Sequence, residues 1–171
     1  MHTETTAEVI TLWRDTVQGA EDRCQVRLPE QVESYLVSLL IRYTNQPALA
    51  NQVIATEFLR ATQETDVMRR YSLANVGDQC LLLSGLFPGV AERRQVKVSY
   101  FVDIGRSAYA DISDTATDLY GSLAIRFVML MDVLQSVNER QVLLPFEAYE
   151  QWEELGSKRA LMALRAYGLR G

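Results

Sequence analysis

Three glycines inside two segments of helical periodicity constrain the fold of this chain more than any other feature. Gly77 and Gly85 lie in an apolar segment, Gly105 lies in an aromatic segment, and a charged turn separates the two. Each glycine destabilises a helix by about 1 kcal/mol relative to alanine, so the fold must need these residues for another reason. Close approach of a neighbouring helix is that reason. We therefore interpret residues 67–112 as a central helical hairpin.

Apolar residues recur at helical spacing along most of the remaining chain. The pattern predicts helices over residues 6–18, 29–43, 48–62, 115–137 and 146–167. Thr5 or Thr6 is the expected cap of the first helix, and Gly19 its expected end. Residues 24–28 alternate between apolar and polar as a short strand does, but no partner strand is visible. We expect this segment to be an extended loop.

The boundaries of three later segments follow from local signals. Residues 88–97 contain a Pro-Gly pair and several charges, which indicates an exposed connection. Ser113-Asp114 is the expected cap of the long apolar helix at 115–137. Arg126 and Asp132 lie within that helix, and charges are costly in a bilayer, so we expect a buried helix without membrane insertion. Gly156-Ser157 predicts a kink in the last helix.

These elements predict an all-α fold with a single domain, an irregular bundle of six or seven helices. The central hairpin, at about 67–112, packs on the long apolar helix at about 115–137. Residues 1–6 are polar and lack periodicity, so we expect a frayed, disordered end. With 171 residues, of which 48% are hydrophobic and 23% charged, the chain can bury a sizeable core in one domain.

Composition disfavours several classes of function. The net charge is −5 and charges of both signs are interspersed, so no nucleic-acid partner is expected. No secretion signal precedes the first helix, which predicts a cytoplasmic protein with reduced thiols. The single histidine, His2, cannot supply a catalytic triad or a polyhistidine metal site. The motifs of di-iron bundles, calcium loops and nucleotide-binding loops are absent too. We predict no catalytic residue, no metal and no cofactor.

The two cysteines differ in their sequence surroundings. Cys80 lies on the apolar side of a predicted helix, where burial favours the thiol. Cys24 follows Arg23 in the predicted loop. We expect Cys24 to be the more accessible of the two.

One polar group flanks the central glycines and is the candidate site. It consists of Asp78, Tyr100, Asp103, Arg106 and Tyr109. In the ligand-binding interpretation, Arg106 binds the anionic end of a small molecule that has an apolar body. In the structural interpretation, which we favour, Arg106 pairs with Asp103 one turn earlier or with Asp78 across the hairpin.

Three functions remain open on the sequence. The leading hypothesis is a cytoplasmic, non-catalytic interaction or regulatory protein that binds a protein partner or forms a homodimer. The second is a helical bundle that binds a small anionic ligand beside Arg106 and the tyrosines. The third is an enzyme that uses Asp78 or Asp103 as an acid or base.

Overall fold

The computed structural model describes residues 5–50 and 54–169, and over these ranges the chain forms ten α-helices, one short 3-10 helix and no strand. The predicted all-α single-domain fold is confirmed. The helix number was underestimated, because several helices predicted as continuous are divided. Of residues 1–6, where a frayed end is predicted, residues 1–4 lie outside the described residues, whereas Thr5 caps the first helix and Thr6 begins it.

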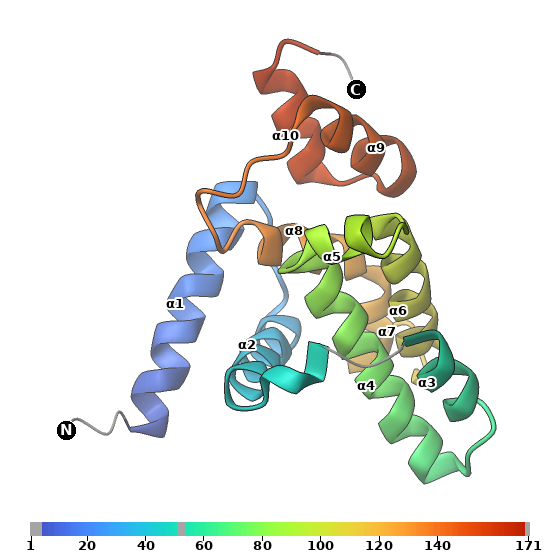
Figure 1. Cartoon of the computed structure of the whole chain (residues 1–171). Helices are drawn as coiled ribbons and strands as arrows, with labels where there is room; N and C mark the ends of the chain where they lie inside the picture. Colours follow the sequence, from blue (N-terminus) through green and yellow to red (C-terminus); the bar gives the residue numbers. More distant parts are fainter. Residues whose placement is uncertain (1–4, 51–53, 170–171) are drawn as a thin grey trace.

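The α-helices follow one another through short connections (Figure 1). Their bounds are α1 Thr6–Cys24, α2 Glu30–Asn45, α3 Ile54–Ala61, α4 Asp66–Gly85, α5 Pro88–Arg93, α6 Val98–Ile112, α7 Leu119–Ile125, α8 Phe127–Gln135, α9 Pro145–Leu155 and α10 Lys158–Ala166, with the 3-10 helix η1 at Pro47–Ala50. The α9–α10 pair sits at the top of the view in Figure 1, at one end of the bundle. None of the helices in the described ranges is long and apolar enough to cross a membrane.

The central hairpin is formed by α4 and α6, as predicted. The two helices run antiparallel, since Arg69 near the start of α4 pairs with Asp111 near the end of α6. The glycines allow the expected close contacts. A methyl group on Gly105 would come within 2.5 Å of the Phe127 ring, and one on Gly77 would overlap the Tyr109 ring.

The first helix extends further than its sequence pattern predicts. Thr5 and Glu8 form a capping box at its start, as expected for a threonine cap. The helix passes Gly19 and ends only at Gln25, which adopts the left-handed conformation with φ of 56°. Cys24 therefore lies inside the helix and is only 1% exposed, so the prediction that it is accessible is wrong. Cys80 is buried, as predicted.

The helix predicted over 115–137 is shorter and divided. Asp118 caps α7 by accepting the Gly121 N–H at 2.7 Å, so the preceding residues 113–117 form a turn, and Ser113-Asp114 is not the cap. A one-residue interruption at Arg126 separates α7 from α8. The backbone bonds from Arg126 to Ser122 and from Leu130 to Arg126 keep the two helices nearly continuous. The predicted apolar helix is thus present as two consecutive helices, α7 and α8.

Two further boundaries differ from the predictions. Residues 88–93 form the short helix α5, since proline is well tolerated at the first helical position. Ala91 of this helix is buried, so the segment is not a fully exposed connection. Gly156, with φ of 66°, ends α9 completely. The Ser157 hydroxyl then accepts the Ala160 N–H at 3.0 Å and starts α10. The predicted kink is therefore a break between two helices.

The interior has one large core and one small one. The large core is built mainly by α1, α2, α4, α6, α7 and α8. The small core lies around α9 and α10 and consists of Leu143, Ala148, Ala160 and Leu164. Because the two cores are separate, the surfaces that meet between them are not completely filled by apolar side chains.

Candidate functional site

Two of the five predicted site residues, Asp78 and Tyr109, meet in the core. Asp78 is 5% exposed, and its Oδ1 accepts hydrogen bonds from the hydroxyls of Tyr35 at 2.6 Å and Tyr109 at 2.7 Å. Its Oδ2 accepts a bond from Arg42 Nη2 at 3.2 Å. Tyr35 and Arg42 come from α2 and Tyr109 from α6. The carboxylate on α4 is thus held by its two neighbouring helices.

Burial dominates the protonation of this cluster. It raises the pKa of Asp78 above the ordinary value, while the hydrogen bonds from Tyr35 and Tyr109 and the Arg42 charge act in the opposite direction. Burial, with the nearby Asp78 charge, also raises the pKa of both tyrosines. Their hydroxyls therefore remain protonated donors. This arrangement is suited to linking helices, because each oxygen of the carboxylate already has a partner.

The other three predicted residues do not join this cluster. Arg106, Tyr100 and Asp103 lie exposed along α6. Across the described residues Arg106 forms no ion pair, so its predicted pairing with Asp78 or Asp103 is wrong. Gly105 faces the core, and the next residue of a helix is turned by about 100° away from it, which points Arg106 to solvent. Arg42, which the sequence did not single out, occupies the predicted place of Arg106 beside Asp78.

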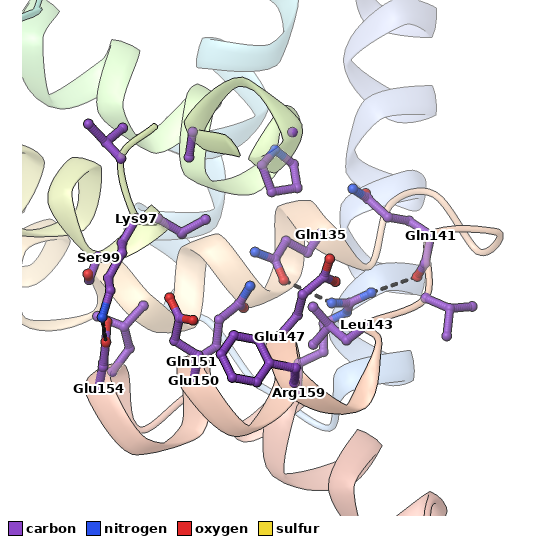
Figure 2. Close-up of a pocket in the computed structure, with 18 residues that line it drawn as sticks. Lys97, Ser99, Gln135, Gln141, Leu143, Glu147, Glu150, Gln151, Glu154 and Arg159 are labelled. Carbon is purple, nitrogen blue, oxygen red and sulfur yellow. Dashed lines mark hydrogen bonds and ion pairs between the residues drawn. The ribbon is translucent and has the colours of Figure 1, made fainter. Parts of the chain in front are cut away.

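A cavity of about 510 Å³ lies where the two cores meet, and we call it the α9 cavity. Figure 2 shows its lining side chains. Its apolar lining comes from α5, the start of α6, the connection to α9 and α9 itself, and comprises Pro88, Ala91, Val96, Val98, Val142, Leu143, Phe146 and Leu155. A site with these dimensions and walls is typical of small-molecule pockets.

One face of α9 supplies four of the nine polar residues that line the cavity. Glu147, Glu150, Gln151 and Glu154 are spaced at i, i+3, i+4 and i+7, which places them on the same side of a helix. The sequence contained this signal. The spacing alone does not reveal a cavity, because α5 and α6, which complete it, are far away in the sequence.

Charged groups at the two ends of the α9 cavity have partners. At one end Lys97 Nζ donates to Glu154 Oε1 at 2.5 Å. This bond lowers the pKa of Glu154 and raises the pKa of Lys97. At the other end Arg159 donates to Gln135 Oε1 at 2.8 Å and to the Gln141 carbonyl at 2.7 Å. Figure 2 shows the two groups on opposite sides of the cavity.

The middle of the cavity contains polar groups without partners. Figure 2 shows Glu150 and Gln151 between the two ends. Gln151 is 7% exposed, and its Oε1 is buried without a hydrogen-bond partner. Glu150 is half-buried and forms no ion pair with any residue that the structure describes. A buried acceptor without a partner destabilises a protein by about 1–3 kcal/mol, which makes this part of the cavity the candidate site.

Metal binding has no geometric support in the described ranges, where no three histidine, cysteine or acidic side chains are arranged to hold an ion. Comparisons of the chain with protein families, with curated proteins and with solved structures find no match. The site is therefore interpreted from its own geometry.

Proposed function

We propose that this chain is a non-catalytic binding protein whose site for a small molecule is the α9 cavity. The observation that carries the proposal is the cavity itself, about 510 Å³ in volume, with apolar side chains along its walls and polar side chains from α9 and its neighbours. Pockets for small ligands typically measure about 300–1,000 Å³ and have this composition. The proposal develops the second hypothesis from the sequence, but moves the site from α6 to α9.

The geometry gives less support to a ligand beside Arg106. Tyr109 is completely buried under Gly77, whereas Arg106 and Tyr100 are exposed, so these side chains do not face a common space. Acid or base chemistry by Asp78 is similarly disfavoured, because two tyrosines and Arg42 occupy its oxygens.

A neutral fluorescent probe tests the proposal. N-phenyl-1-naphthylamine brightens when it enters an apolar site, and we expect this enhancement with the wild-type protein. Gly89→Trp should abolish it, because Gly89 lines the cavity and a side chain added there starts in open space. Ser107→Trp, on the exposed side of α6, is the matched control and should bind the probe normally. Equal binding by both variants, or none by the wild type, would reject the proposed site.

A second candidate is the interaction protein favoured by the sequence. Val67, Met68 and Tyr71 form an exposed face in the first turns of α4, and they are 80%, 53% and 66% exposed. Exposed apolar groups of this kind occur at protein interfaces. We propose that this face forms an isologous homodimer, in which the same surface of both copies is buried. Light scattering at micromolar concentration should give twice the monomer mass and Tyr71→Glu the monomer mass; a wild-type monomer at every concentration would reject the dimer.

A cytoplasmic location completes the proposal. Cys24 and Cys80 are both free and buried, as expected for thiols in a reducing compartment.

A further inference from the structure

We infer that the ligand of the α9 cavity is a protonated primary amine with an apolar body. The inference rests on the proposed function and adds the chemical class of the ligand. It reverses the charge predicted for the ligand from the sequence, where Arg106 suggested an anionic end.

The charges that line the cavity favour a cation. Its acidic residues are Glu147, Glu150 and Glu154, and its basic residues are Lys97 and Arg159. Three negative charges against two positive charges leave one negative charge in excess. A ligand with a single positive charge would neutralise the cavity, whereas a carboxylate or phosphate would add to the imbalance.

Among the three acids, Glu150 is the one without a hydrogen-bonded partner in the described residues, although its charge also helps to raise the pKa of Lys97. Lys97 is bonded to Glu154 at one end, and Arg159 donates to Gln135 and to a backbone carbonyl at the other. Glu147, beside Arg159, already accepts the Leu144 N–H at 3.3 Å as part of a helix cap. Glu150 lies between the ends, and no side chain within the described residues forms a hydrogen bond with it.

The hydrogen-bonding groups of the cavity favour a cation that has N–H groups. A carboxylate such as Glu150 only accepts hydrogen bonds, and the atom of Gln151 that lacks a partner is also an acceptor, Oε1. Gln151 lines the cavity next to Glu150 on the same helix. An ammonium group has three donors and can satisfy both acceptors, whereas a quaternary ammonium has none. The apolar body of the ligand would then pack on Val96, Val98 and Leu155.

Four probes with the same phenylbutyl body test the charge and the donors separately. They are 4-phenylbutylamine, 4-phenylbutanol, 4-phenylbutyrate and phenylbutyltrimethylammonium. The affinity of each is measured at neutral pH by its competition with N-phenyl-1-naphthylamine for the wild-type protein. We expect the amine to bind about ten- to a hundredfold more tightly than the alcohol, the ratio expected for hydrogen bonds to a charged group. The trimethylammonium probe should bind more weakly than the amine, and the butyrate most weakly.

Substitution of Glu150 tests whether this residue causes the preference for the amine over the alcohol. Glu150→Gln should abolish the preference for the amine over the alcohol, because the ammonium group would lose its charged acceptor. Glu153→Gln is the matched control, because Glu153 is exposed on the same helix and does not line the cavity. It should retain the full preference.

The outcomes separate the two proposals. If the alcohol, the butyrate or the trimethylammonium probe binds as tightly as the amine, the amine inference is wrong while the α9 cavity remains a binding site. An amine preference that survives in Glu150→Gln would also overturn the inference. If neither the naphthylamine nor the alcohol binds, both the proposed function and the amine inference are wrong.

Discussion

At the scale of single residues, the Asp78 carboxylate joins three helices through polar contacts. It lies on α4, and it accepts hydrogen bonds from Tyr35 and Arg42 of α2 and from Tyr109 of α6. A buried charge of this kind is tolerated only when it is paired and hydrogen-bonded. Removal of one partner should therefore destabilise the fold more than the loss of an ordinary surface contact.

Arg42→Ala tests this dependence, and we expect it to lower the free energy of unfolding by about 1–3 kcal/mol. The reason is that Asp78, whose pKa is already raised by burial, would lose the cation that faces it in the core. Arg106→Ala is the matched control, since Arg106 is exposed and without an ion pair among the described residues; its effect should stay within about 0.5 kcal/mol. Urea denaturation measures both. A larger loss for Arg106→Ala than for Arg42→Ala would contradict this account of the cluster.

At the scale of elements, the α4–α6 hairpin depends on side chains that occupy the space above its glycines. Gly77→Ala should lower the free energy of unfolding by about 1–3 kcal/mol, the usual effect of overpacking a core. The new methyl group would overlap Tyr109, which is fully buried and held by Asp78, so the ring cannot move easily. The midpoint of urea denaturation gives the change.

Gly89→Ala is the control for this prediction. No atom lies within 4 Å of a methyl group added at Gly89, so only the higher helix propensity of alanine should act, with a stabilisation of up to about 1 kcal/mol. If both alanine variants are equally stable, the contact between Gly77 and Tyr109 is not as close as the structure has it.

The sequence predicted those elements whose signals are local. The spacing of apolar residues located α2, α4 and α6, and the glycines indicated the close hairpin. It failed at Gly19, because a single glycine does not end a helix whose next turns carry buried residues such as Ala20 and Cys24. It also failed for the cavity, because α9 meets α5 and α6 only through tertiary packing. Asp78 was recognised, but Arg42 was not, since helix periodicity does not show which face meets another helix.

For the whole molecule, buried acids on different helices give stability a common dependence on pH. Burial raises the pKa of Asp132 on α8 to about 6, against bonds from Ser157 and the Arg159 backbone that lower it. Burial and the nearby Glu33 together raise the pKa of Glu21 on α1 to about 7. A raised pKa means that the folded state binds protons more tightly than the unfolded chain. The contribution of these two acids to the free energy of unfolding is therefore greatest at about pH 4, and it decreases as the pH rises to about 7.

Glu21 provides the sharpest test of this pH dependence. Its Oε1 accepts the Leu28 N–H at 2.7 Å, whereas its Oε2 is buried without a hydrogen-bond partner. Glu21→Gln keeps an oxygen for Leu28, carries no charge and presents an NH2 group towards Glu33. Above pH 7 we expect this variant to be more stable than the wild type by about 1–3 kcal/mol, the usual cost of an unsatisfied buried polar group.

The comparison across pH distinguishes a buried charge from a general effect of removing an acid. Near pH 4 the wild-type Glu21 is protonated and neutral, so the advantage of Glu21→Gln should disappear there. Glu153→Gln removes an exposed acid from α9 and should follow the wild-type pH profile throughout. Urea denaturation of the three proteins between about pH 4 and pH 8 measures these curves over the range in which carboxyl groups with raised pKa titrate. A Glu21→Gln curve parallel to the wild-type curve would mean that Glu21 titrates in the folded protein as an ordinary surface glutamate does.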